Sequence, residues 1–527
     1  MVRIGRAAAL LALAVAIFLG SCSRLVLKRG GHWPPHVEEA LRKAGDNRAE
    51  LEKVLEHYEQ EGDSLKLEAA YFLISNMEGH SFARLVYYDS TGAEYDFDVM
   101  EFPDYETLRD SVNRIERRVG SLDYHASEVL EDLEHMSSRL LIEHIDYAFR
   151  AWRELPWAQD LGFERFREFV LPYRGSNEPL ESWRPYFMRL YSDLPEKMED
   201  PTDPIEAAAL INKDLGTWFK FDPRFYLHPT DQGLCDMLKN RLGRCEDIAN
   251  LTIYALRANA IPITSDYTPY WADASNNHAW TAVIDANGHA LLPEGSRREP
   301  KRYEPWNRVA KVYRKTFSRQ DTNLVFIKPE WEEVPGWLRG KSYVDVTSEY
   351  TKVADVHLTL EEAVPESVNF AYLCVFNAGG WRPIHWGRLR GTEVTFKGMG
   401  VGIAYLPAYY VKGEVKPASP PFILENDGSV RPLPGRGEPI RLHLVSTTRR
   451  KQLVDTDGVE KAFFEDGKKY TLYYWDGDWK EVGSQVAEGG PLDFDGVPGG
   501  ALYWLTEENS YGEERIFTYE EGHQVWW

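Results

Sequence analysis

The chain has very few cysteines. Only four occur in 527 residues, at positions 22, 235, 245 and 374. Small exported domains that depend on disulfides are rich in cysteine, so a disulfide scaffold is excluded for a chain of this length. If the first cysteine is used at the N-terminus, three thiols remain, and one of them must stay unpaired within the chain. A free thiol needs a chemical reason, which directs attention to the residues around each cysteine.

Long apolar runs are missing after the first twenty residues, so no membrane-spanning helix is predicted beyond them. The N-terminus itself has the layout of a cleaved signal peptide: Arg3 and Arg6, a short apolar run over 7–18, and small residues before Cys22. The tetrapeptide Leu-Gly-Ser-Cys at 19–22 resembles a bacterial lipobox. That resemblance implies lipid on Cys22 and a membrane-anchored protein facing the periplasm or the cell surface. The alternative is an ordinary signal peptide with an incidental cysteine.

Positive charge is also scarce, because 61 lysines and arginines stand against 83 acidic residues and give a net charge of −22. A nucleic-acid partner is therefore disfavoured, since phosphate contacts need clustered basic residues. Phosphate loops, zinc-ligand spacings and dinucleotide fingerprints are absent from the sequence, so we predict no cofactor and no metal. The glycines at 398–402 lack the strand-turn-helix context of a phosphate loop.

The length and the changing texture predict a multidomain α+β protein. Helical spacing dominates the N-terminal part, with helices expected over 36–62, 64–77 and 124–152. Another helix is expected over 205–219, capped by Asp203. A helix-then-strands region follows, and the last third is rich in short strands. The predicted parts are a signal peptide (1–21), a lipidated tether (22–34), a helical domain (35–202), an α+β core (203–317) and two β-sandwich-like domains (318–437 and 438–527).

An internal repeat supports the two C-terminal domains. Residues 372–381 match 470–479 at an offset of 98, and Phe396, Gly398 and Tyr405 have counterparts at the same offset. The tryptophans of these domains allow two interpretations, sugar-stacking platforms or core packing. They occupy positions 381, 386, 475, 479, 504, 526 and 527.

The sharpest segment of the sequence is 242–250, Leu-Gly-Arg-Cys-Glu-Asp-Ile-Ala-Asn. Gly243 allows a tight turn before a helix that ends near Asn259 and Pro262. Cys245 is thus expected at the helix N-terminus, where free N–H groups and the helix dipole stabilise a thiolate. The acidic residues at 246 and 247 oppose that effect. A nearby imidazole would help to keep the sulfur charged.

Such an imidazole is available at His278. Strands are predicted over 263–270 and 277–284, with a turn at 285–288 and a third strand at 290–292. A histidine at the start of a strand that packs on the cysteine's helix can act as a general base and ion-pair partner. Cys235 and Cys374 have no such context and are expected to be structural.

Together these motifs resemble the transglutaminase-like superfamily, which shares its catalytic arrangement with papain-type proteases. The similarity lies in Gly-Arg-Cys-Glu-Asp (243–247), Leu-Arg-Ala-Asn-Ala-Ile-Pro (256–262) and His-Ala-Trp (278–280), and it covers about 204–317. It implies a papain-like core with Cys245 as nucleophile and His278 as base. The family's third residue is an aspartate in the next strand; here Glu294 occupies that place, Asp285 is the competitor, and a site with neither is also possible.

Two functions follow as hypotheses. The first is a cysteine acyl-transfer enzyme acting on a peptide or protein substrate. It would be a peptidase or amidase if water is the acceptor and a cross-linking acyltransferase if a lysine is. Hydrolysis is favoured for an exported chain without calcium-site motifs. The second is an inactive transglutaminase-like scaffold in a surface lipoprotein that binds glycan or protein through its β-domains.

Overall fold

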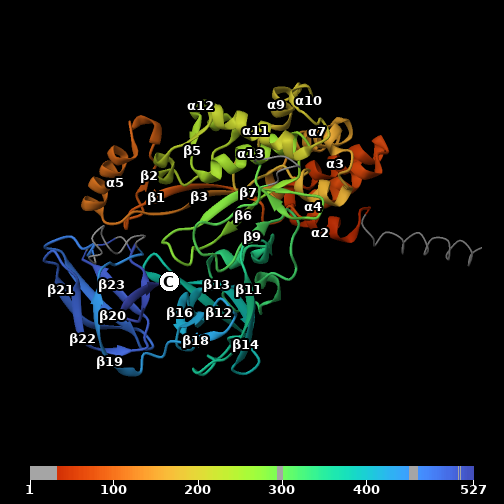
Figure 1. The fold of residues 1–527 in the computed structure, drawn as a ribbon. Helices are drawn as coiled ribbons and strands as arrows, with labels where there is room; N and C mark the ends of the chain where they lie inside the picture. The colour runs from red at the N-terminus through yellow and green to blue at the C-terminus, as the bar shows by residue number, and fades with distance from the viewer. Residues whose placement is uncertain (1–31, 294–300, 450–460, 509, 511) are drawn as a thin grey trace, which may run out of the picture.

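The structure is a computed structural model that describes residues 32–293, 301–449, 461–508, 510 and 512–527. Helices gather on one side of the molecule, an antiparallel sheet lies in the middle, and two β-rich domains lie below it (Figure 1). The protein is therefore a multidomain α+β protein, as predicted. Cys22 and Glu294 lie outside the described residues. Within the described ranges, no helix combines the length and the apolar character needed to cross a bilayer.

Most of the expected N-terminal helices are present. Asp63 caps one of them, because its carboxylate accepts the N–H groups of Leu65 and Lys66. The helices of this part are α2 (Pro35–Lys43), α3 (Arg48–Glu61), α4 (Ser64–Ser75), α5 (Tyr105–Val119), α6 (Asp132–His135), α7 (Ser138–Glu154), α8 (Phe163–Phe169), α9 (Arg184–Leu190) and α10 (Leu194–Lys197).

The prediction of a helix over 124–152 is wrong for the first half of that range. Residues Asp123–Glu131 form strand β3, which pairs antiparallel with β1 (Ser81–Tyr88), and β1 also pairs with β2 (Glu94–Tyr95). The helical apolar spacing does not begin until after residue 128, and β1 supplies the hydrogen bonds that the segment needs. Tertiary pairing thus overrides local pattern. The remainder of the predicted helix is α7, whose N-cap Ser137 accepts the Leu140 N–H.

The central unit is a helix–sheet layer. Asp203 caps α11 (Pro204–Trp218), as predicted, by accepting the Ile205 N–H at 2.9 Å. Helix α13 (Cys245–Ala258) is almost wholly buried. It packs on a five-stranded sheet of order β10-β9-β6-β7-β8. The other elements are η4 (Pro223–Leu227), α12 (Leu234–Asn240), β4 (Lys220–Phe221), β5 (Leu242–Gly243), β6 (Ile263–Thr268), β7 (His278–Ile284), β8 (Ala290–Leu291), β9 (Tyr313–Lys315) and β10 (Tyr343–Asp345).

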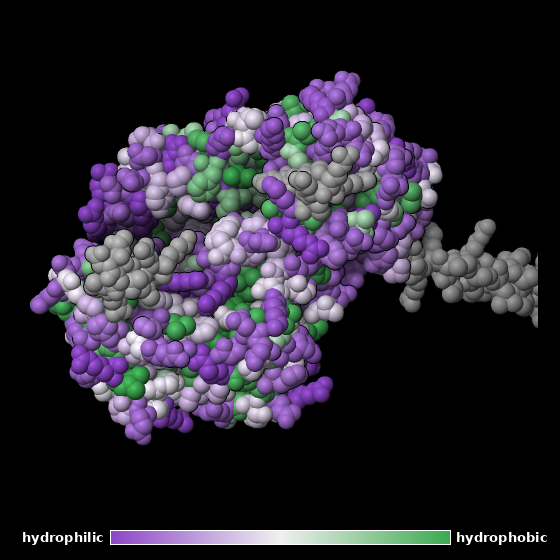
Figure 2. Space-filling view, viewed as in Figure 1, coloured by the Kyte–Doolittle hydropathy of each residue, from purple (hydrophilic) through white to green (hydrophobic). Residues whose placement is uncertain are grey.

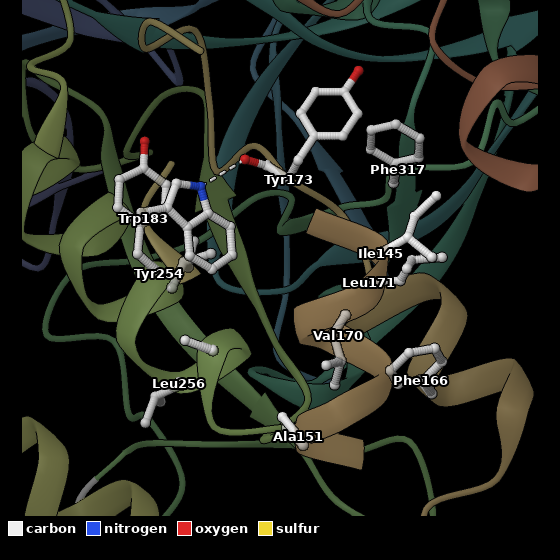
Figure 3. Packing of buried hydrophobic residues seen from close by; sticks show 14 of the residues in the cluster. Ile145, Ala151, Phe166, Val170, Leu171, Tyr173, Trp183, Tyr254, Leu256 and Phe317 are labelled. Carbon is white, nitrogen blue, oxygen red and sulfur yellow. Dashed lines mark hydrogen bonds between the residues drawn. The ribbon is translucent and has the colours of Figure 1, made fainter. Parts of the chain in front are cut away.

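A single hydrophobic core joins the N-terminal helices to α13 (Figure 3). Tyr254 of α13 stacks on Trp183, with ring centroids 4.8 Å apart, and the Trp183 indole donates to the Tyr173 carbonyl at 2.9 Å. The buried Arg184 guanidinium donates to the carbonyl of Arg257, near the end of α13. The helix that begins at Cys245 is therefore held along its length by the N-terminal helices.

The two C-terminal β-domains have the same topology, which confirms the repeat. Each contains a main sheet, ordered β13-β12-β15-β17-β18 or β21-β20-β23-β24-β25, and a two-stranded sheet, β11-β14 or β19-β22. The strands are β11 (Val353–Thr359), β12 (Phe370–Asn377), β13 (Gly380–Arg388), β14 (Glu393–Gly400), β15 (Ile403–Val411), β16 (Glu414–Pro417), β17 (Phe422–Leu424), β18 (Val430–Pro432), β19 (Gly437–Leu444), β20 (Lys469–Trp475), β21 (Trp479–Val486), β22 (Leu492–Gly499), β23 (Tyr503–Glu507), β24 (Ile516–Glu520) and β25 (His523–Trp526).

Equivalent tyrosines form the same hydrogen bond in both repeats. The Tyr405 hydroxyl donates to the Gly400 carbonyl at 2.8 Å, and the Tyr503 hydroxyl donates to the Pro498 carbonyl at 2.6 Å. Both tyrosines are completely buried. The hydroxyl in each case satisfies a carbonyl at the end of the preceding strand.

We predict that Tyr405→Phe and Tyr503→Phe destabilise the protein by similar amounts. Each substitution keeps the ring and leaves one carbonyl without its donor, which costs about 1 kcal/mol. Urea unfolding followed by tryptophan fluorescence measures the loss. Tyr473→Phe, which changes a half-buried ring of β20, is the control and should leave stability nearly unchanged. A loss at only one of the two repeat positions would contradict their equivalence.

Candidate active site

Cys245 is the first residue of α13, as predicted. The short parallel strands β4 and β5 lead the chain to it, and Asp247 closes the turn by accepting the Arg244 N–H at 2.9 Å and the Gln232 N–H at 3.0 Å. Gly243 is needed for space and not for a left-handed turn. A Cβ there would lie 2.7 Å from the Asp247 Cβ and 2.8 Å from the Phe219 ring. At its other end, α13 is capped by Asn259, as the sequence indicates, and the left-handed residue is the next one, Ala260, with φ 53°.

The fold brings His278 to the same end of this unit as Cys245. After α13 the chain reverses into β6, which runs back along the helix, and Thr268 at the end of β6 pairs with His278 at the start of β7. Fourteen helical residues and six strand residues both span about 20 Å. Helix α13 also packs directly on β6 and β7. The two predicted residues thus lie at one edge of the helix–sheet layer.

In this structure the Cys245 thiol donates to Glu246 and not to His278. The Sγ–Oε2 distance is 3.0 Å. Burial, followed by the charge and hydrogen bond of Glu246, raises the pKa of Cys245 from 9.0 to about 12. Burial lowers the pKa of His278, and the Glu246 charge opposes that shift. The expectation of a stabilised thiolate is therefore not met, because desolvation and a like charge outweigh the helix N-terminus.

Aromatic rings surround His278 on several sides. Its ring centroid lies 4.7 Å from Trp306, 5.7 Å from Trp280 and 5.8 Å from Trp271. Trp306 is 65% exposed, so one face of this aromatic group reaches solvent. The imidazole nitrogens of His278 have no hydrogen-bond partner within the described part of the chain. Sequence reasoning missed Trp306, which lies outside the recognisable motifs.

Tyr226 contributes a second exposed ring from η4, which packs against β5 just before Cys245. Tyr226 is 53% exposed, and its ring contacts that of Phe221 at 5.6 Å. Burial, followed by the negative charges of Cys245 and Glu246, raises the pKa of Tyr226. Figure 2 shows a mostly hydrophilic face, with apolar side chains reaching the surface over the region of β5 and α13.

Of the two candidates for the third member, only Asp285 can be placed. It follows β7 at the end opposite His278, and its Oδ1 accepts the N–H groups of Asn287 and His289 at 2.8 and 2.9 Å. Asp285 is therefore a turn residue, and the structure does not bring it to the imidazole. Glu294, outside the described residues, stays a prediction.

The loop that leads into His278 is held by the C-terminal domains. The Asn377 amide, at the end of β12, donates to the carbonyls of Trp271, Ala274 and Asn276 at 2.8–3.0 Å. The buried Arg515 guanidinium donates to the carbonyls of Ala272 and Ala274. We call these contacts the loop clamp. They come from both repeats and restrain the backbone just before the histidine.

Comparison with protein families supports this picture. Residues 192–291 match the family model of the transglutaminase-like superfamily. This region is a transglutaminase-like domain. Its span includes Cys245 and His278 but ends before Glu294. No curated protein gives a significant match to the sequence. Over the described ranges, no group of three or more histidine, cysteine or acidic side chains is arranged to hold a metal ion.

We predict that Asn377→Asp loosens the loop before His278. The carboxylate keeps the shape of the amide, but it faces three carbonyls without a proton to donate, and losing such buried bonds costs about 1–3 kcal/mol. Hydrogen–deuterium exchange of peptides covering 271–277 should rise clearly. Asn369→Asp, at the other end of the same strand, is the matched control, because Asn369 contacts Glu332 instead. Equal exchange over 271–277 in wild type and Asn377→Asp would refute the loop clamp.

Proposed function

We propose that this protein is an exported, lipid-anchored cysteine hydrolase that cleaves peptide or amide bonds through a thioester on Cys245. The observation that supports the proposal is a transglutaminase-like domain whose span includes Cys245 at the start of α13 and His278 at the start of β7. The anchor would be lipid on Cys22, with the domains facing the periplasm or the cell surface.

The chemistry begins with proton transfer from the Cys245 thiol to the His278 imidazole. The thiolate attacks the carbonyl carbon of the substrate amide, and the backbone N–H of Cys245 stabilises the oxyanion, because the first turn of a helix has free N–H groups. The C–N bond breaks as the imidazolium gives its proton to the leaving amine, which leaves a thioester. His278 then takes a proton from water as the water oxygen attacks the thioester carbonyl carbon. The C–S bond breaks, the imidazolium returns the proton to the sulfur, and the products are the free Cys245 thiol and a carboxylic acid.

Glu294 is proposed to orient the imidazole, as the aspartate of the family does. A glutamate can accept the same ring N–H with a longer side chain. Asp285 has no part in this scheme, because its carboxylate already accepts two turn N–H groups. Water is the proposed acceptor, and a lysine amine in its place would make the product a cross-link.

The alternative is a surface binding protein with an inactive core. The hydrogen bond from the Cys245 thiol to Glu246 supports this alternative. The tryptophans that suggested sugar binding lend it little support. Trp475, Trp526 and Trp527 are buried, and Trp381, Trp475, Trp479 and Trp504 contact one another or Phe376 where the two repeats meet. In these domains the aromatic rings pack as core.

We predict that hydrolysis of a peptide library by the full chain falls at least about 100-fold in Cys245→Ala and in His278→Ala, since each removes a reacting group. Mass spectrometry of released products measures the rate, and acid-quenched intact mass detects the thioester. Asp285→Asn is the matched control and should keep full activity. Hydrolysis that persists in Cys245→Ala would contradict the hypothesis that Cys245 is the nucleophile of a hydrolase. Binding to a glycan array by Cys245→Ala, without hydrolysis of any peptide by wild type, would favour the binding protein.

A further inference from the structure

Glu246 occupies the place next to the sulfur where a substrate has to approach. Its Oε2 accepts the Cys245 thiol at 3.0 Å, while its side chain remains 32% exposed. The nearest cation is the Arg244 guanidinium, whose Nε lies 3.6 Å from the same oxygen. The carboxylate thus contacts the nucleophile on one side and solvent on the other.

The other charged side chains around the sulfur already have hydrogen-bond or ion-pair partners within the protein. Arg244 is largely buried, pairs with Asp231 and donates to the His228 carbonyl. Asp247 has both oxygens engaged by the N–H groups of Gln232 and Arg244. Two further titratable groups interact electrostatically with this part of the site, Tyr226 on η4 with Cys245 and Glu246, and His278 on β7 with Glu246. Glu246 is therefore the group whose charge most directly opposes a thiolate at Cys245.

A thiolate next to this carboxylate is unfavourable unless a positive charge enters with the substrate. Two like charges in a partly buried site raise each other's proton affinity. An incoming ammonium group would bind the carboxylate, remove the hydrogen-bond acceptor of the thiol and offset the repulsion. The thiol proton would then pass to His278, which lies at the same edge.

The surroundings suit an ammonium group. Tyr226 lies on η4, which packs against β5, and the Trp306 ring lies 4.7 Å from that of His278; both aromatic side chains are mainly exposed. A carboxylate combined with exposed aromatic rings is the usual chemistry for holding an alkylammonium ion. The overall charge of −22 also draws cations toward the protein.

We propose that Glu246 binds a primary ammonium group of the substrate, and that the substrate class is peptides with such a group beside the amide that Cys245 attacks. This inference rests on the proposed hydrolase function and narrows its substrate. Glu246 is then a specificity-determining residue that keeps the thiol protonated until a cationic substrate is present.

The test measures the pH dependence of Cys245 alkylation by iodoacetamide in the full chain, followed by peptide mapping. It needs no turnover. Saturating Nα-acetyl-lysine methylamide should speed alkylation of Cys245 at pH 8 by about tenfold, which corresponds to a pKa shift of roughly one unit. The same compound acetylated on Nε carries no charge and should have no effect. In Glu246→Gln, Cys245 should be alkylated faster in the absence of either compound, and neither compound should change that rate.

Cys235 provides an internal control, because this exposed thiol on α12 lies beside another glutamate, Glu181. Its alkylation rate should be the same in every arm. The inference is overturned if the charged and neutral lysine compounds act alike, or if Glu246→Gln still responds to the charged one. If Glu246→Gln does not fold, the wild-type comparison decides alone.

Failure of the inference and failure of the proposed function give different results. A protein that hydrolyses peptides and their Nε-acetylated forms equally well is a hydrolase without the ammonium site. If the protein hydrolyses no peptide but the lysine compound speeds alkylation of Cys245, the cation site is supported and the hydrolase function is not.

Discussion

The geometry of the candidate site depends on hydrogen bonds that cross between domains. Asn377 and Arg515 donate to main-chain carbonyls of the loop before His278, and they come from the first and the second β-domain respectively. Carbonyls that are covered by a neighbouring domain need donors, and this loop obtains them from residues more than a hundred positions away. The chain ends close to the same junction, and the Trp527 carbonyl also accepts from Arg515 (Figure 1). The β-domains are therefore part of the support of the imidazole.

The state of the thiol follows from a balance of magnitudes. A helix N-terminus favours a negative charge by about 0.3–1 kcal/mol, and up to about 2 kcal/mol in buried geometries. The shift of the Cys245 pKa from 9.0 to about 12 corresponds to roughly 4 kcal/mol in the opposite direction. Burial and Glu246 therefore outweigh the helix N-terminus, so the environment favours the uncharged thiol of Cys245, and burial also lowers the pKa of His278. A substrate that carries positive charge is the simplest means of reversing that balance.

Local signals made the central unit predictable from sequence. The Asp203 cap, the helix start at Cys245, the β6–β7 hairpin strands and the turn at Asp285 all depend on residues close together in the chain. Strand β3 was missed because its hydrogen bonds come from β1, forty residues away, and the apolar spacing downstream resembled a helix. The loop clamp and the aromatic group around His278 arise from long-range packing, as does the contact with Phe219 that helps to exclude a Cβ at Gly243. No local pattern reports such contacts.

Whether sulfur 245 and imidazole 278 form one reactive pair can be decided by a crystal structure of the full chain inactivated with a peptidyl aldehyde. We expect a hemithioacetal on the Cys245 sulfur, with a His278 ring nitrogen within hydrogen-bond distance of the sulfur or of the adduct oxygen. We also expect the Glu246 carboxylate to have turned away from the sulfur. An adduct on another residue, or an imidazole that remains out of reach of the modified sulfur, would show that the two residues do not act together.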